Sequence, residues 1–184
     1  MKYHLDRSKF KSNQLFFNHI YNNLGCDFEI AYAEKDKWTC WYKYSTLMQL
    51  HKDTKISCLS IGWVKVDEFI ELVNNRTVLD IEIVLDLDDL QVIKNYKNIL
   101  SRVEDWNFKW YECYLTGGKG IHIHMIMPGL REIDEEDRKW IKSKVISSLL
   151  GETLKANKKV MIALEYSKHR KTGEKKVKMN GNGN

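Results

Sequence analysis

Three separated stretches of the chain carry residue types that act on phosphate groups and metal ions. Asp86 and Asp88 supply two carboxylates in the stretch VLDLDDL (84–90). Glycines precede two histidines in LTGGKGIHIHM (115–125), and basic residues crowd EYSKHRKTGEKK (165–176). A nucleoside triphosphate with its metal ions needs carboxylates for the metal, and backbone N–H groups and cations for the phosphates. The three stretches together therefore predict one nucleotide site.

Asp86 and Asp88 form a carboxylate pair. Side chains two residues apart on a strand point the same way, roughly 6.5 Å apart along it. Carboxylates this close repel each other, and a divalent cation such as Mg²⁺ or Mn²⁺ relieves the repulsion. Asp89 lies off that face and suits the N-cap of a following helix. The alternative is that the three aspartates only end a strand and begin a helix in solvent.

The glycine stretch has the features of a phosphate-binding turn. It contains three glycines and a lysine, namely Gly117, Gly118, Gly120 and Lys119. Glycines let the backbone approach a phosphate closely and turn its N–H groups inward. His122 and His124 alternate on the strand that follows, so both face one side. Neither the GxxxxGK[ST] loop nor the dinucleotide fingerprint matches this spacing. A plain hairpin turn with two surface histidines is the alternative.

Basic charge gathers near the C-terminus. Residues 155–178 hold nine Lys or Arg against two Glu, a local charge of +7 within a chain of net charge +5. Such a segment is typical of a site for a polyanion, and a solvated basic tail is the alternative. Lys37 and Lys43 lie among aromatic residues that could stack on template bases, namely Trp38, Trp41 and Tyr44. Ordinary core packing is the alternative for those aromatic residues.

The hydrophobic pattern predicts an α+β fold. The N-terminal part is expected to form a helix at 13–24, β-rich segments at 28–33 and 38–44, and a helix at 66–73. Further on we expect a strand at 78–86, a helix at 90–103, strands at 110–115 and 121–127, a helix capped by Asp134 that runs to 149, and a strand at 160–164. This order is that of the split βαβ, or ferredoxin-like (RRM-like), arrangement with an N-terminal α/β extension.

The 184 residues are expected to form one domain, residues 1–178, followed by a disordered tail at 179–184. Only one proline occurs, and there is no linker-like or repeated segment. The four cysteines are scattered without a CxxC pair, which disfavours a zinc site or a disulfide framework. No segment approaches membrane-spanning length, so no membrane partner and an intracellular location, cytoplasmic or nucleoid-associated, are expected.

With these residues assembled, the chain resembles the catalytic domain of the archaeo-eukaryotic primase superfamily, which includes primase small subunits and primase-polymerases. The resemblance covers roughly residues 66–178. The family pattern begins with Asp-x-Asp, continues with Ser-Gly-x-x-Gly-x-His and closes with Ser-x-His-x-Lys-Thr-Gly. The matching residues are Asp86 and Asp88, then Thr116 (for Ser), Gly117, Gly120 and His122, then Ser167, His169, Lys171, Thr172 and Gly173.

The resemblance implies a role for each matched position. Asp86 and Asp88 would bind the catalytic metal, Mg²⁺ or Mn²⁺, with a third acid, and His122 would complete the catalytic set. Glu165 is preferred as the third acid because it ends an apolar strand, whereas Glu152 has a spacing closer to that of primase small subunits. The residues expected to hold the nucleotide are Thr116, Gly117, Gly118, Lys119, Gly120, His122, Ser167, His169 and Lys171.

The expected activity is that of a DNA or RNA primase, a template-dependent nucleotidyltransferase that releases pyrophosphate by two-metal phosphoryl transfer. Its expected partners are a single-stranded nucleic-acid template and nucleoside triphosphates. A second primase subunit or a helicase is the replication protein that would accompany it. Two alternatives stay open: a primase-like subunit that binds nucleic acid without catalysis, and a metal-dependent nuclease.

Overall fold

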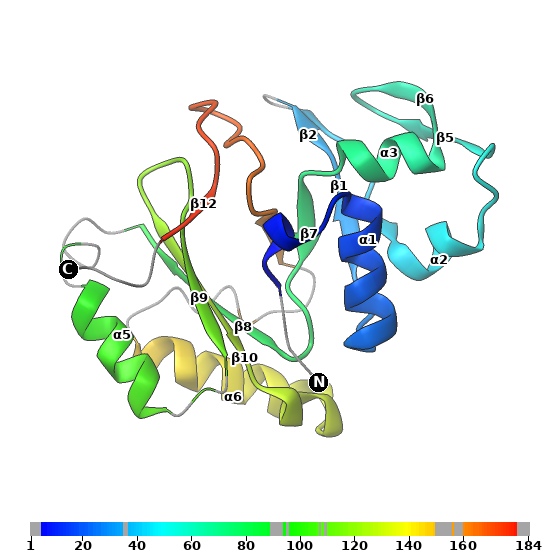
Figure 1. Ribbon diagram of the computed structural model, residues 1–184. Helices are drawn as coiled ribbons and strands as arrows, with labels where there is room; N and C mark the ends of the chain where they lie inside the picture. Colours follow the sequence, from blue (N-terminus) through cyan, green and yellow to red (C-terminus); the bar gives the residue numbers. More distant parts are fainter. Residues whose placement is uncertain are drawn as a thin grey trace.

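Two four-stranded antiparallel sheets organise the protein, with helices packed against them (Figure 1). The computed structural model describes residues 5–34, 37–88, 94, 96–106, 108, 110–149, 156 and 160–179. The expected α+β class is confirmed, since both sheets are antiparallel and several helices accompany them. Within these ranges, no helix is both long and apolar enough to cross a membrane.

The N-terminal half carries short strands and short helices. In chain order they are η1 (Arg7–Lys9), α1 (Asn13–Asn18), the π-helical turn η2 (His19–Asn23), β1 (Glu29–Ala31), β2 (Ala33–Glu34), β3 (Lys37–Trp38), β4 (Tyr42–Lys43), α2 (Tyr44–Gln49), β5 (Lys55–Cys58), β6 (Gly62–Lys65), α3 (Val66–Leu72) and β7 (Asn75–Thr77). The helices expected at 13–24 and 66–73 are therefore present. The β5–β6 hairpin and α2 are additions that the hydrophobic pattern did not predict.

The C-terminal half has longer elements. They are β8 (Glu82–Leu87), α5 (Tyr96–Asp105), β9 (Tyr111–Leu115), β10 (Ile121–Ile126), η3 (Pro128–Glu132), α6 (Glu135–Ser148), β11 (Met161–Ala163) and β12 (Val177–Lys178). Asp134 caps α6 as predicted, because its carboxylate accepts a hydrogen bond from the Asp137 N–H at 2.9 Å. The cap expected at Asp89 lies outside the described residues.

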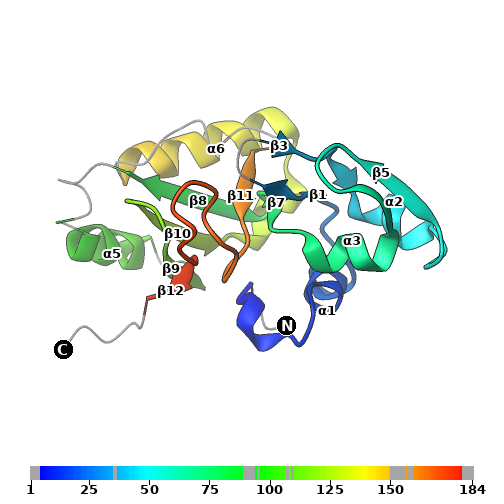
Figure 2. The ribbon, with the colours of Figure 1, turned by 90° about the horizontal axis from the view of Figure 1, so that it is seen from above.

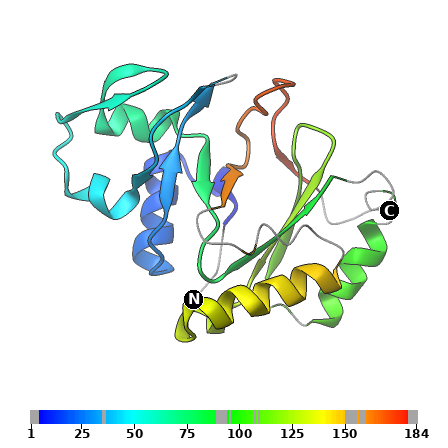
Figure 3. The same ribbon diagram turned by 180° about the vertical axis from the view of Figure 1, so that it is seen from behind.

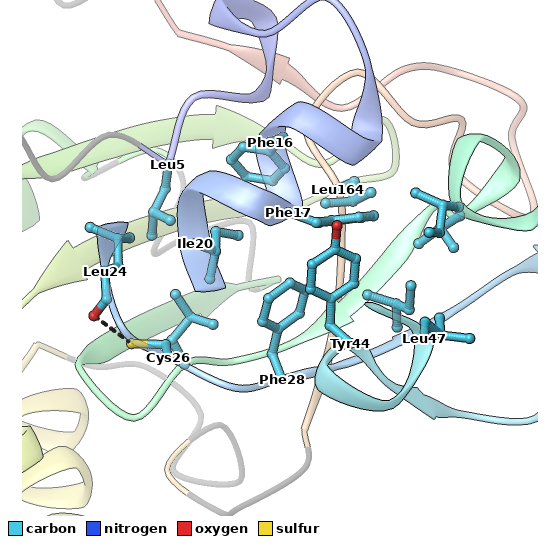
Figure 4. Packing of buried hydrophobic residues seen from close by; sticks show 14 of the residues in the cluster. Leu5, Phe16, Phe17, Ile20, Leu24, Cys26, Phe28, Tyr44, Leu47 and Leu164 are labelled. Atoms are coloured by element: carbon cyan, nitrogen blue, oxygen red, sulfur yellow. Dashed lines mark hydrogen bonds between the residues drawn. The ribbon is translucent and has the colours of Figure 1, made fainter. Parts of the chain in front are cut away.

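The first sheet has the order β11-β7-β1-β4 and packs against α1 and α3. Its core is rich in aromatic rings (Figure 4). Phe28 and Tyr44 stack with ring centroids 5.1 Å apart, and Phe17 meets the Tyr44 ring edge-on. Tyr44 is 1% exposed, so this aromatic residue belongs to the core and does not offer a base-stacking surface.

The second sheet has the order β12-β9-β10-β8 and two chemically different faces. Helices α5 and α6 lie on one face of this sheet (Figure 3). Apolar side chains of β8 and β10 are buried between the sheet and these helices. These side chains are Ile83, Leu85, Leu87, Ile121, Ile123 and Met125. Because side chains alternate along a strand, the residues between them point to the opposite face. That opposite face carries Glu82, Asp86, His122 and His124, and it holds the candidate site.

The order β8, α5, β9, β10, α6, β11 follows the expected chain order, and β10 lies between β8 and β9. The last strand differs from the ferredoxin-like arrangement, since β11 pairs with β7 of the first sheet, with Ala163 opposite Asn75. Among the strands described, β11 makes no pair with β8. The segment expected as one strand at 78–86 also differs, since it bends before β8, where the Glu82 N–H donates to the Leu79 carbonyl at 3.0 Å.

Candidate functional site

Asp86 and His122 meet at the polar face of the second sheet. They lie directly opposite each other in the β8–β10 pair, and His122 Nε2 is 3.2 Å from Asp86 Oδ1. Both residues are about nine-tenths buried. The carboxylate therefore orients the imidazole, and a predicted metal-binding residue stands in contact with a predicted phosphate-binding residue.

Asp88 lies just beyond the end of β8 and is exposed. The Asp88 carboxylate lies against Gly120 of the glycine turn. A Cβ atom at Gly120 would collide with Asp88 Oδ1 and would come 3.1 Å from the Leu87 carbonyl oxygen. A larger residue at position 120 would push the Asp88 carboxylate aside from its place in this conformation. The two predicted carboxylates therefore stand at the same end of the sheet, beside the turn.

The glycine turn joins β9 to β10 and is held by Thr116. The Thr116 Oγ1 accepts hydrogen bonds from the N–H groups of Gly118 (3.3 Å) and Gly120 (3.2 Å), and it donates to the Gly120 carbonyl at 3.1 Å. These two N–H groups were expected to face a phosphate, and in this conformation they face the threonine hydroxyl instead. Gly117 has a φ of +76°, a conformation that favours glycine.

The basic loop 165–176 packs against that turn. The Thr172 hydroxyl donates to the Gly117 carbonyl at 2.6 Å, and a Cβ at Gly118 would lie 3.2 Å from His169 Nε2. The Thr172 N–H donates to His169 Nδ1 at 3.3 Å. In a neutral imidazole, an accepting Nδ1 leaves the proton on Nε2. His169 therefore presents an N–H donor toward the glycine turn.

The other predicted phosphate ligands lie around this contact. Lys119 is exposed at the tip of the turn, and Lys171 is exposed in the loop. The Ser167 hydroxyl donates to the Leu164 carbonyl at 2.6 Å, so its proton is already used inside the loop. The structure thus brings the two lysines and His169 to the neighbourhood of the turn, and it gives Ser167 a role in shaping the loop.

Glu165 is buried beneath the loop, where it is 2% exposed. The Glu165 Oε1 lies 3.9 Å from Lys176 Nζ, and neither carboxylate oxygen of Glu165 has a hydrogen-bond partner among the described residues. Burial raises the pKa of the Glu165 carboxyl group. Across the described ranges, no group of three or more His, Cys, Asp or Glu side chains is arranged to hold a metal ion. Glu165 therefore does not form a three-carboxylate cluster with Asp86 and Asp88 here. Glu152, the other candidate, lies outside the described residues.

A chain of buried ionisable side chains lies next to the site, and it was not predicted from the sequence. Arg76 holds Glu82 through two hydrogen bonds, of 2.7 and 2.9 Å. Glu82 Oε1 lies 2.7 Å from His124 Nδ1, and His124 Nε2 lies 2.9 Å from Lys176 Nζ. All four residues are completely buried. The chain of contacts connects β7, β8 and β10 to the C-terminal loop.

Charge pairing and burial set the protonation of this network. Burial alone would raise the pKa of Glu82, but Arg76 and His124 hold that pKa well below its usual value. Burial, together with the Lys176 charge, lowers the pKa of His124 to about 3, so this imidazole is neutral. A signal did exist in the sequence, because Glu82 interrupts an otherwise apolar run, and a charge inside a buried strand needs a partner.

A cavity of about 670 Å³ opens beside the loop, between it and the N-terminal half. Its lining includes Arg7, Tyr32, Glu165, His169 and Arg170. Seen from above, the loop lies between the two sheets (Figure 2). The described residues that line the cavity do not include Asp86, Asp88, His122 or the glycine turn, so the cavity lies beside the acidic strand end and not over it.

Tyr166, which also lines the cavity, has a φ of +64°. Residues other than glycine adopt this left-handed conformation only at a cost, and such strain is concentrated at functional sites.

Comparisons of the chain with protein-family models, with curated proteins and with solved structures find no match. What the protein does is therefore inferred from these contacts.

Proposed function

We propose that the chain is a template-dependent nucleotidyltransferase of the archaeo-eukaryotic primase type, which joins nucleotides and releases pyrophosphate. One observation carries the proposal: the acidic strand end, the glycine turn and the basic loop converge. Asp86 lies 3.2 Å from His122, Asp88 lies over Gly120, and His169 faces Gly118. These are the residue types that a nucleoside triphosphate and its metal ions require.

A ferredoxin-like catalytic core is part of the proposal. The strand order β9-β10-β8 and the packing of α5 and α6 on one face of that sheet support it. The fourth strand, β11, would then be a displaced member of the core that pairs with β7.

Asp86 and Asp88 would hold Mg²⁺ or Mn²⁺. Mg²⁺ sites in nucleotide enzymes commonly use one or two carboxylates and complete their shell with phosphate oxygens and water. The room that Gly120 leaves for the Asp88 carboxylate fits such a site, and Glu165, whose Oε1 lies 3.9 Å from Lys176 Nζ, would not be needed as a ligand. When bound, the ion would neutralise phosphate charge and make the attacking hydroxyl a better nucleophile.

The protein's own groups would position the triphosphate. His169 presents its Nε2–H beside the turn, and Lys119 and Lys171 add positive charge from the turn and the loop. Asp86 fixes the orientation of His122. Preorganised donors and charges of this kind act by placing the reacting phosphate and by stabilising the charge that develops on it.

The experiment that tests the proposal is the extension of a labelled primer on a single-stranded template with nucleoside triphosphates and Mg²⁺ or Mn²⁺. Lengthening of the primer that requires both template and metal is expected. Shortening of the primer without added nucleotide would identify a nuclease. Binding without either change would identify a non-catalytic subunit, and each of these two results would overturn the proposal.

A further inference from the structure

The hairpin formed by β5 and β6 has an inner face and an outer face. Ile56 and Cys58 are buried on the inner face, against the first hydrophobic core. The residues between them point the other way, and Trp63 on this outer face is 72% exposed. Leu59 at the turn is 80% exposed. Two large apolar side chains are thus exposed on one short hairpin, and exposed apolar surface that polar residues surround marks interaction sites.

The outer face also concentrates positive charge. Lys55 and Lys65 lie directly opposite each other in the strand register, one residue pair away from the Ser57–Trp63 pair on the same face. Like charges in directly opposed positions destabilise a hairpin. Asp53 lies 3.7 Å from Lys65 but is 94% exposed, so it compensates only weakly. A bound anion would relieve the repulsion between the lysines.

The hairpin stands at the same end of the molecule as the glycine turn and the basic loop, with β2 and β3 between them (Figures 1 and 3). Trp38, at the end of β3, is partly exposed, and the Arg170 guanidinium lies over its ring, 5.5 Å from the centroid. Aromatic and basic side chains therefore recur along this end, from the candidate site through Trp38 to Trp63.

We infer that the outer face of the β5–β6 hairpin binds single-stranded nucleic acid, at a distance from the reacting groups. Bases would stack on Trp63, while Lys55 and Lys65 would pair with phosphates. Aromatic residues alternating with cations suit this partner, since stacking accepts any base and the cations follow the backbone. The inference rests on the proposed function in so far as the bound strand is the template.

The test measures the affinity of the full chain for fluorescently labelled oligothymidylates of about 16 and about 4 nucleotides. Trp63→Ala is expected to weaken binding of the longer strand about fivefold or more, and the shorter strand, which can bind the hairpin by itself, is expected to lose affinity as well. Trp140→Ala is the matched control, because Trp140 is also highly exposed (61%) but lies on α6. Equal affinities of the Trp63 and Trp140 variants for the longer strand would overturn the inference.

A second variant tests the lysines separately. Replacing both Lys55 and Lys65 with serine is expected to reduce the slope of log affinity against log salt by about 1.4, the amount for two lost phosphate contacts on a single strand. An unchanged slope would contradict the assigned phosphate contacts. A change in sedimentation of the free protein on Trp63→Ala, with oligonucleotide affinity unchanged, would assign the face to self-association and overturn the inference.

These readouts separate the inference from the proposed function. Hairpin-dependent binding by a protein that extends no primer would leave the binding surface standing and remove the polymerase. Primer extension by the wild type, with binding that the hairpin variants do not change, would remove the surface and leave the polymerase standing.

Discussion

Lys176 Nζ lies 2.9 Å from His124 Nε2, and this contact fixes the tautomer of a buried histidine. A protonated lysine amine can only donate, so Nε2 accepts, and the imidazole proton sits on Nδ1, from where it donates to Glu82. Burial lowers the pKa of Lys176 to about 8, and the Glu165 carboxylate acts in the opposite direction. The C-terminal loop is thereby tied to β10 next to the candidate site.

The carboxylate pair is the first target for substitution. The double variant Asp86→Asn, Asp88→Asn is expected to lower primer extension by about 100-fold or more, since metal binding contributes several kcal/mol of charge stabilisation. Thermal melting is expected to change little, because both substitutions keep the shape of the side chain. Asp105→Asn, at the exposed end of α5, serves as the control. Full activity in the double variant would remove the assigned metal site.

Two glycines offer a matched test of the contact between turn and loop. Gly117 and Gly173 have nearly the same φ, +76° and +77°. A Cβ at Gly117 would lie 2.5 Å from the Glu174 carbonyl oxygen, whereas a Cβ at Gly173 would meet nothing within 4 Å. Gly173→Ala is expected to cost about 1 kcal/mol of stability from the backbone conformation alone.

Gly117→Ala adds a clash with the loop backbone, so we expect a larger loss of stability and a loss of primer extension. Chemical denaturation and the extension assay check the two variants side by side. Equal behaviour of the two variants would mean that the loop does not depend on its contact with the turn.

The buried Arg76–Glu82 pair is expected to dominate stability. Glu82→Ala would leave Arg76 buried without its hydrogen-bonded carboxylate, and breaking a buried pair in this way typically costs about 3–5 kcal/mol. Asp53→Ala breaks an exposed pair with Lys65 and is expected to change stability little. Urea denaturation measures both variants, and comparable stabilities for the two would show that the buried pair is compensated in another way.

The lowered pKa of the buried His124 is expected to make the free energy of unfolding depend on pH. Its pKa is about 3 in the folded protein and 6.5 ordinarily, so between these values the unfolded chain binds more protons. The free energy of unfolding therefore decreases as pH falls from about 6.5, with a slope approaching about 1.4 kcal/mol per pH unit.

Measurements between about pH 6.5 and pH 5.5 lie above most of the titration of Glu82 in the unfolded chain, since the ordinary pKa of Glu82 is 4.5. His124→Gln is expected to flatten the slope in this window, and His51→Gln, at an exposed position, provides the comparison. A slope that His124→Gln leaves unaltered would contradict the assignment.

Local signals predicted much of the fold. Asp134 and the acidic residues after it predicted the start of α6, and the alternation of His122 and His124 with apolar residues predicted β10 and its two faces. The convergence of the three stretches was also predictable, because each carried part of the chemistry of one ligand. These features depend on residues that are close in sequence or that share one chemical role.

Features that depend on distant partners could not be predicted. The pairing of β11 with β7 joins segments that are far apart in sequence, and no local pattern reveals it. Glu165 was expected at the metal, but Lys176 lies next to it instead. The Thr116 hydroxyl accepts the N–H groups that were assigned to phosphate. In each case the outcome depends on which residue, distant in sequence, lies next to a given group in the folded chain.

The C-terminal segment crosses from one sheet to the other. It begins as β11 beside β7, continues as the loop on the glycine turn and ends as β12 beside β9. Just after β12, the Met179 N–H donates to the Cys113 carbonyl at 2.9 Å. Residues 180–184 lie outside the described residues. Removing this segment would take Lys176 away from His124 in the second sheet. It would also remove an edge strand from each sheet, β11 from the first and β12 from the second. The two hydrophobic cores are thus coupled thermodynamically, and heating is expected to melt them in a single cooperative transition.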